Sequence, residues 1–207
     1  MAGARPECIG VLLAGGESRR FGGLPKGLAI VDEMRIADRA IAALRAASDD
    51  VIVVANDPDA QSWFPTMRVV ADAVPGLGPL AGIETALRAA NGAAVLVVAW
   101  DMPFVPAPLL RGMRALGDTG AEAVAPVHDD PPMIESLCAY YAASALPACS
   151  ELLARGERRA WSLFAQLPSA LAVPERVLVE HGVPERIFFS VDEPEELEEL
   201  GGELPRR

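Results

Sequence analysis

The sequence predicts an α/β protein in which helices cover both faces of a mostly parallel β-sheet. Short runs that are apolar on both faces alternate with segments of helical periodicity, as expected for a buried parallel sheet with helical crossovers. The chain has 207 residues, 51% of them hydrophobic, so one domain can bury a sizeable core. There is no internal repeat and no low-complexity linker, and we therefore expect residues 1–207 to form a single domain.

The first half of the chain carries the regular alternation. Continuous apolar runs predict strands over Ile9–Leu13, Val51–Asn56, Arg68–Asp72 and Ala93–Asp101. Apolar residues at helical spacing predict helices over Ile36–Ala46, Gly82–Ala90 and Leu109–Leu116. After about residue 120 the pattern is looser. There we expect strands over Ala123–Val127, Leu137–Tyr141 and Ile187–Ser190, and helices over Ala142–Ala154 and Ala160–Leu167. The acidic segment "DEPEELEEL" predicts a last, solvent-facing helix with Pro194 in its first turn.

Composition excludes several classes of protein. A duplex-binding protein needs a basic face to neutralise phosphates, and the net charge of −11 argues against one, so we expect no nucleic acid partner. The longest apolar run, Ala93–Trp100, is too short to cross a bilayer, and the N-terminus lacks the pattern of a signal peptide. The three cysteines are widely separated, which argues against a disulfide framework or a zinc site and fits a reducing cytoplasm.

A glycine-rich loop follows the first predicted strand, within "VLLAGGESRRFGGLPKG" from Val11 to Gly27. Glycines let backbone N–H groups point into a concavity, and a phosphate can then approach without meeting a Cβ. Arg19, Arg20 and Lys26 add positive charge, so the loop suits a polyphosphate. It is not a P-loop, because Lys26 is followed by a glycine instead of a serine or threonine.

Two aspartates follow strands that should end on the same edge of the sheet. Ligands of open parallel sheets bind beyond these carboxyl ends, where Asp72 and Asp101 are expected. Taken singly, Asp72 has an alternative as a turn cap, and Asp101 as a cap for the segment that Pro103 begins. Together with the glycine-rich loop they favour a binding site. Asp101 is the best candidate for a magnesium ligand, since this ion takes few protein carboxylates and completes its shell with phosphate oxygens and waters.

Two further features carry less information. The stretch Gly76–Ala81 fits a dinucleotide fingerprint poorly, because it lies off the end of its strand and lacks an acid at the expected distance. It is a tight turn into the next helix, a backbone surface against a base or ribose, or both. His128 and His181 lie in turn-like stretches with no obvious partner, so no nucleophile–base pair is evident.

These motifs together resemble the molybdenum cofactor guanylyltransferases (the molybdopterin-guanine dinucleotide biosynthesis protein A type) of the NTP-transferase family. The segment "LAGGESRRFGGLPKG" is similar to the motif LAGG-x-S-x-R-(M/F)-G-x(2,3)-K-G, which many nucleotidyltransferases share. "DAVPGLGPLAGI" and "WDMPFVP" resemble two further family segments, and the GPLAG part discriminates best. "GERRAWSLFAQL" and "FFSVDEPEEL" are similar to the C-terminal half, so the likeness spans nearly the whole chain.

The resemblance implies a three-layer, Rossmann-like fold of the nucleotide-diphospho-sugar transferase type. It implies a cytoplasmic, magnesium-dependent transferase that moves GMP from GTP to molybdopterin or molybdenum cofactor, giving molybdopterin guanine dinucleotide and pyrophosphate. Residues 1–120 would form the nucleotide-binding half and residues 121–207 the acceptor-binding half. Other molybdenum cofactor biosynthesis proteins and molybdoenzymes are the implied protein partners; neither a nucleic acid nor a membrane is among the expected partners.

The resemblance also implies the site residues. Lys26 and Asp101 would be catalytic, and Asp101 would hold magnesium. The implied nucleotide-binding residues are Leu13, Ala14, Gly15, Gly16, Ser18, Arg19, Lys26, Asp72, Gly78, Pro79, Leu80 and Asp101. In this scheme the backbone of Leu13, Ala14 and Gly15 holds the guanine nucleotide, and Lys26 contacts its phosphates.

The sequence departs from the family pattern near its end. Ser190 and Asp192 stand where the family has asparagines. Two roles are possible for Asp192: a second ligand on the metal side of the site, or the N-cap of the last helix. The segment "HDDPPMIESLCAYY" lacks a clear basic residue for an anionic pterin phosphate. Two rivals therefore stay open: a related transferase that uses CTP or a sugar phosphate, and a non-catalytic GTP-binding assembly protein.

Overall fold

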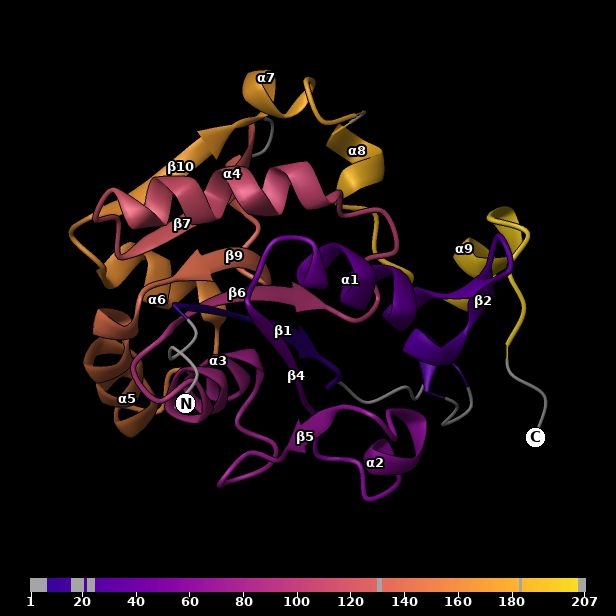
Figure 1. Ribbon diagram of the computed structural model, residues 1–207, viewed down its shortest axis with the longest axis horizontal. Helices are drawn as coiled ribbons and strands as arrows, with labels where there is room; N and C mark the ends of the chain where they lie inside the picture. The colour runs from indigo at the N-terminus through magenta and orange to yellow at the C-terminus, as the bar shows by residue number, and fades with distance from the viewer. Residues whose placement is uncertain (1–6, 16–20, 22–24, 130–131, 183, 205–207) are drawn as a thin grey trace, which may run out of the picture.

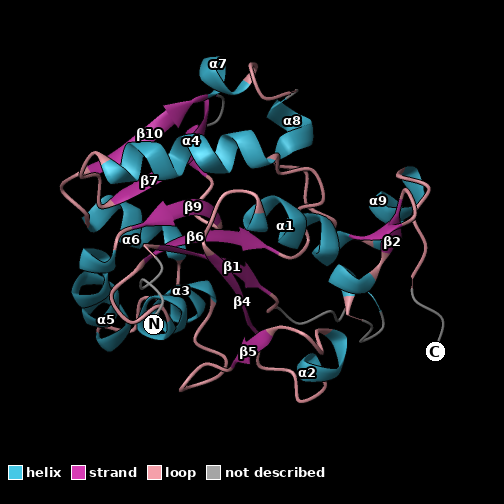
Figure 2. Cartoon of the chain, viewed as in Figure 1, coloured by secondary structure: helices cyan, strands magenta, loops and turns pink. Residues whose placement is uncertain are grey.

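A mixed β-sheet forms the middle layer of the protein, and helices cover both of its faces (Figures 1 and 2). The computed structural model describes residues 7–15, 21, 25–129, 132–182 and 184–204. The strands of the main sheet are β1 (Cys8–Leu13), β4 (Asp50–Val54), β5 (Arg68–Val70), β6 (Ala94–Ala99), β7 (Ala123–Asp129), β8 (Pro132–Ile134), β9 (Cys138–Tyr141) and β10 (Ala170–Pro174). Their order across the sheet is β10-β7-β9-β6-β1-β4-β5, with β8 paired to β7.

Most strands of this sheet run in one direction. β1 pairs in parallel with β4 and β6, β4 with β5, and β7 with β10. β9 is antiparallel to both β6 and β7, so those two strands point the same way. The carboxyl ends of β1, β4, β5, β6 and β7 therefore share one edge. The predicted mostly parallel α/β fold is confirmed.

Alternate strand residues supply the two cores, which explains why the strands are apolar on both faces. Leu12, Val53 and Val98 belong to the core under α1 (Ile36–Arg45) and α4 (Ala107–Asp118). Leu13 and Val97 face the opposite core, under α3 (Pro79–Ala89), α5 (Leu146–Ala154) and α6 (Ala160–Gln166). The short helices α2 (Ala60–Trp63), α7 (Glu175–Leu178) and α8 (Pro184–Ile187) contribute to the first core.

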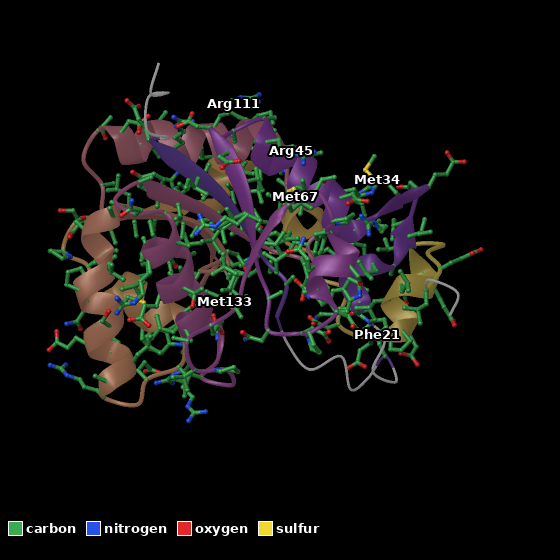
Figure 3. The ribbon with its side chains drawn as sticks, turned by 60° about the horizontal axis from the view of Figure 1, so that its bottom comes forward. Phe21, Met34, Arg45, Met67, Arg111 and Met133 are labelled. Carbon is green, nitrogen blue, oxygen red and sulfur yellow. The ribbon has the colours of Figure 1, made fainter. Side chains whose placement is uncertain are left out.

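A third, smaller core joins the two ends of the chain. It packs beside the hairpin of β2 (Ile30–Val31) and β3 (Met34–Arg35) and the last helix, α9 (Pro194–Glu199). Phe21, from the glycine-rich segment, is buried there with Val191 and Leu197. Figure 3 shows Phe21 next to the yellow C-terminal segment. This core therefore holds Val191, which precedes α9, close to Phe21.

The second half departs from the sequence prediction. The predicted strand Ile187–Ser190 is wrong: Ile187 ends α8, and Phe188 is buried against the first core without pairing in a sheet. The sheet edge is instead occupied by β10, a short segment with exposed residues and a proline that gave little strand signal. The predicted helix Ala142–Ala154 divides into a 3-10 turn, Ala143–Ala145, and α5. α3 begins at Pro79, three residues before the predicted Gly82.

The three cysteines lie in the interior of the protein. Cys8, Cys138 and Cys149 are all buried and free. Burial raises the pKa of the Cys8 and Cys149 thiols to about 12, so they stay protonated and unreactive near neutral pH. In the part of the chain that the structure describes, no helix is long and apolar enough to cross a membrane.

Candidate active site

A cleft of about 930 Å³ opens at the carboxyl edge of the sheet. Its walls come from the ends of β1, β4, β5 and β6 and from the first turn of α3. The predicted site residues that line it are Leu13, Ala14, Gly15, Lys26, Asp72, Gly78, Pro79 and Asp101. The volume lies in the range of small-molecule and cofactor pockets. The structure thus brings together residues that the sequence spreads from position 13 to position 101.

The remaining predicted residues have other positions. Gly16, Ser18 and Arg19 lie outside the described residues. Leu80 does not line the cleft, because its side chain is fully buried in the core under α3. The Leu80 side chain therefore cannot contact a base bound in the cleft. Asp192 lies beside the cleft through its contact with Lys26.

Lys26 and two carboxylates form an ion-paired group. The Lys26 Nζ lies 2.6 Å from Asp101 Oδ2 and 2.8 Å from Asp192 Oδ1. The side chains of Lys26 and Asp101 are only 14% and 16% exposed, whereas that of Asp192 is 49% exposed. Ser190 Oγ donates a hydrogen bond of 2.6 Å to Asp192 Oδ2. The Asp101 carboxylate is thus directed at Lys26, and the alternative in which it caps the segment at Pro103 is wrong.

The charge state of Lys26 follows from this pairing. Burial by itself favours the neutral amine and would lower the pKa of Lys26. The charges and hydrogen bonds of Asp101 and Asp192 outweigh burial, so the pKa of Lys26 is raised above its ordinary 10.5. The ammonium is therefore fully charged at neutral pH, as a phosphate-binding lysine must be.

Asp192 does not cap the last helix. The N-cap of α9 is Glu193, whose side chain accepts a hydrogen bond from the N3 backbone in a capping box. Glu196 completes the box: its Oε2 accepts from the backbone N–H groups of Asp192 and Glu193 over 2.6 Å and 2.8 Å. The N-cap alternative for Asp192 is wrong, because Pro194 begins the helix and Glu193 immediately precedes it. The metal-side alternative stays a prediction.

Asp72 is held in place by two side chains. Thr85 Oγ1, on α3, donates to Asp72 Oδ1 over 2.7 Å, and Asn56 Nδ2 donates to Asp72 Oδ2 over 2.8 Å. The Asp72 backbone N–H donates in turn to Asn56 Oδ1 over 2.8 Å. These hydrogen bonds orient the Asp72 carboxylate at the cleft wall. Asn56 follows β4 and Thr85 lies on α3, so neither donor belongs to the turn that contains Asp72.

The turn before α3 requires a glycine. Gly78 is the N-cap of α3 and has φ +79°, in the left-handed region that favours glycine. A Cβ there would lie 3.0 Å from the carbonyl oxygen of Arg158, which also accepts from the Leu80 N–H over 3.2 Å. Arg158 Nη1 donates to the Gly76 carbonyl over 3.1 Å. The loop before α6 therefore buttresses this rim of the cleft from behind.

Trp100 packs between Gly27 and Trp63. A Cβ on Gly27 would lie 2.4 Å from the Trp100 ring, so residue 27 has no room for a side chain. The rings of Trp63 and Trp100 stack with centroids 6.0 Å apart and an interplanar angle of 22°. Trp100 precedes Asp101, and Gly27 follows Lys26. The stack therefore fixes the backbone on both sides of the Lys26–Asp101 pair.

Asp101 and Asp192 are the two carboxylates beside Lys26 that could hold a metal ion. Their oxygens already converge on one cation, the Lys26 ammonium. Over the described ranges of the chain, no group of three or more His, Cys, Asp or Glu side chains has a metal-binding arrangement. Magnesium needs only one or two carboxylates when phosphate oxygens and waters complete its shell, so this donor set fits magnesium bound together with a triphosphate.

His128 has a partner that the sequence did not reveal. It lies in β7, and its Nε2 is 2.7 Å from Glu135 Oε1. The edge of its ring meets Phe188, with ring centroids 5.2 Å apart. The expectation of a turn-like, unpartnered His128 is therefore wrong. His181 does lie in a turn, where its backbone N–H donates to the Leu178 carbonyl.

Sequence reasoning missed several residues of the cleft and its support. Asn56 directly follows the second predicted strand, so the rule that found Asp72 and Asp101 could have found it. Trp63 and Thr85 gave no such signal, because α2 and α3 bring them to the site only in the folded chain.

Comparison with known proteins agrees with this site. A sequence model of the MobA-like NTP transferase domain matches residues 10–171. A probable molybdenum cofactor guanylyltransferase of Chloroflexus aggregans is 36% identical over 152 residues, which cover 72% of this chain and 73% of that protein. The molybdenum cofactor guanylyltransferase of Pasteurella multocida is 35% identical over 167 residues, covering 79% of this chain and 86% of that protein.

A solved structure has the same fold. Molybdopterin-guanine dinucleotide biosynthesis protein A from Archaeoglobus fulgidus superposes with a TM-score of 0.77 and 24% identity, covering 93% of this chain and 96% of that one. The match of the domain model to residues 10–171 takes in every predicted site residue except Asp192. The chain therefore belongs to the family of MobA-like NTP transferase domains.

Proposed function

We propose that this protein transfers GMP from GTP to the terminal phosphate of molybdopterin or molybdenum cofactor. The products are molybdopterin guanine dinucleotide and pyrophosphate. The observation that carries the proposal is the Lys26–Asp101 pair, 2.6 Å apart, on the same cleft as the Leu13–Gly15 backbone and Asp72. The guanylyltransferases of Chloroflexus aggregans and Pasteurella multocida, about a third identical to this chain, support the choice of substrates.

The nucleotide occupies the cleft, whose walls come mainly from the first half of the chain, residues 1–120. The backbone of Leu13, Ala14 and Gly15 and the turn at Gly78 and Pro79 accommodate the guanine nucleoside, because neither glycine presents a Cβ to it. Asp72, oriented by its two side-chain donors, binds the same nucleoside. Gly16, Ser18 and Arg19 would continue this contact along the phosphates.

Lys26 and the carboxylates act at the triphosphate. Lys26 turns from its carboxylate partners to the phosphate oxygens and neutralises their charge. Asp101, with Asp192 as its neighbour, is then free to hold magnesium. Magnesium, when bound, supplies charge to offset the negative charge that develops on the leaving pyrophosphate.

No covalent enzyme intermediate is needed. An oxygen of the acceptor phosphate attacks the α-phosphorus of GTP and forms a new P–O bond. The bond between the α-phosphorus and the oxygen that bridges it to the β-phosphate breaks, and pyrophosphate leaves with that oxygen. A phosphate anion is already a competent nucleophile, so the chain's own contribution is alignment and charge neutralisation. Residues 121–207 form the half that receives the acceptor.

The test is pyrophosphate release by the purified full chain from each of the four nucleoside triphosphates, with molybdopterin and with or without Mg²⁺. We expect release from GTP only, dependent on both molybdopterin and Mg²⁺, with the dinucleotide product identified by mass spectrometry. A preference for CTP, or turnover with a sugar phosphate in place of molybdopterin, would assign a different transferase. Tight GTP binding without any pyrophosphate release would indicate a non-catalytic assembly protein.

A further inference from the structure

The acceptor-binding half must receive an anion although the chain is strongly acidic. Its arginines within the described residues are Arg155, Arg158, Arg159, Arg176 and Arg186. Arg155 pairs with Glu151, and Arg159 pairs with Glu157 over 2.9 Å. Arg158 Nη1 donates a hydrogen bond to the Gly76 carbonyl at the rim of the nucleotide cleft. Arg158 lacks a carboxylate partner among the described residues, but this hydrogen bond engages its guanidinium. In the part of the chain that the structure describes, Arg176 and Arg186 have neither a carboxylate partner nor a side-chain hydrogen bond.

Of these two arginines, Arg186 lies at the active-site segment. Its guanidinium carbon lies 4.5 Å from the ring centroid of Phe104, three residues beyond Asp101. Phe104 also packs against Phe189, with ring centroids 6.4 Å apart. The Val191 N–H donates to the Asp101 carbonyl over 2.9 Å. Residues 186–192 therefore run beside residues 101–104, with Arg186 at one end of the contact.

The other end of the same segment is Asp192, which contacts Lys26. Figure 1 shows α8, which carries Arg186, beside the start of α4, where the chain arrives from Asp101. Arg186 thus borders the reacting region, and it is absent from the walls of the nucleotide cleft.

The contact with Phe104 leaves the guanidinium able to bind an anion. A guanidinium stacked on an aromatic face keeps its N–H donors in its own plane, where they match the oxygens of a phosphate. The Arg186 side chain is exposed, so these donors are accessible. An acceptor phosphate must approach the bound triphosphate, which repels it, while Lys26 is committed to that triphosphate. A further cation on the acceptor side offsets that repulsion.

We propose that Arg186 binds the phosphate of the acceptor and guides it toward the α-phosphorus of GTP. This inference rests on the proposed function, and it supplies the basic residue that the segment "HDDPPMIESLCAYY" lacks. Arg186 is on this view a substrate-binding residue for the second substrate and has no part in binding GTP.

The experiment measures KM for molybdopterin and KM for GTP separately, in Arg186→Gln, Arg186→Lys and the wild type. The control is Arg176→Gln, which removes an exposed arginine of α7 that likewise has no carboxylate or hydrogen-bond partner within the described residues. We expect Arg186→Gln to raise KM for molybdopterin about tenfold, as loss of a charge-assisted hydrogen bond predicts, with KM for GTP unchanged. Arg186→Lys should restore part of the loss, and Arg176→Gln should match the wild type.

An unchanged KM for molybdopterin in Arg186→Gln would overturn the inference while leaving the proposed function standing. Failure of the wild type to transfer GMP would overturn the proposed function instead. In that case, the binding of inorganic phosphate to the full chain, measured by titration calorimetry, tests whether Arg186 binds an anion. Weaker phosphate binding in Arg186→Gln than in Arg176→Gln supports an anion site at this arginine, and equal binding in the two variants refutes it.

Discussion

Replacing Gly27 by alanine tests whether the tryptophan stack fixes the Lys26–Asp101 pair. The new Cβ would lie 2.4 Å from the Trp100 ring, closer than real Cβ contacts allow. Trp100 is only 2% exposed and stacks on Trp63, so the ring cannot retreat without moving its neighbour. Overpacking of this kind costs about 1–3 kcal/mol of unfolding free energy. At about 2–4 °C per kcal/mol for a chain of this size, we expect Tm to fall by about 2–12 °C.

A matched control separates stability from function. A Cβ on Gly117 would lie 2.2 Å from the Tyr140 ring, under α4 and opposite Leu96 of β6, away from the cleft. Gly117→Ala should therefore also lower the unfolding free energy. The higher helix propensity of alanine offsets about 1 kcal/mol of this loss. Scanning calorimetry gives Tm for both variants, and pyrophosphate release gives KM for GTP. We expect KM for GTP to rise in Gly27→Ala alone. A Gly27→Ala protein with wild-type Tm and KM would refute the reasoning.

Two further predictions concern the ion-paired group. Asp101→Asn should lower magnesium-dependent pyrophosphate release about 100-fold or more while Tm changes little, because Lys26 keeps Asp192 as a partner; near-normal release would refute the metal assignment. Lys26→Met should lower the unfolding free energy at neutral pH. Because the folded-state pKa of Lys26 is raised, its contribution is complete below the ordinary pKa of 10.5 and is lost as pH rises through the higher folded value. The difference between wild type and Lys26→Met in urea unfolding should therefore shrink between about pH 10.5 and higher pH; a constant difference would contradict the pairing.

The part of the site that the sequence predicted follows from one rule about sheets. Asp72 and Asp101 follow apolar runs, and parallel strands bring their carboxyl ends to one edge, so the sequence alone predicts both aspartates on one cleft. Asn56 obeys the same rule. The glycine-rich loop could be recognised because its composition reports a local backbone requirement.

The remaining contacts depend on segments that meet only in three dimensions. Asp192 is 166 residues from Lys26, and no local pattern indicates that their side chains lie 2.8 Å apart. The predicted strand Ile187–Ser190 failed for a related reason: its apolar residues are buried by the first core and the Phe104 contact, which replace strand pairing.

The sequence by itself determined the alternation of strands and helices, the loop chemistry and the two aspartates, because each depends on periodicity or on residues close together in the chain. The tertiary structure alone decided the partners: Lys26 with Asp192, Trp100 with Gly27 and Trp63, and Arg186 with Phe104. Packing selects these contacts among many chemically similar side chains, and that selection depends on which elements are neighbours in space.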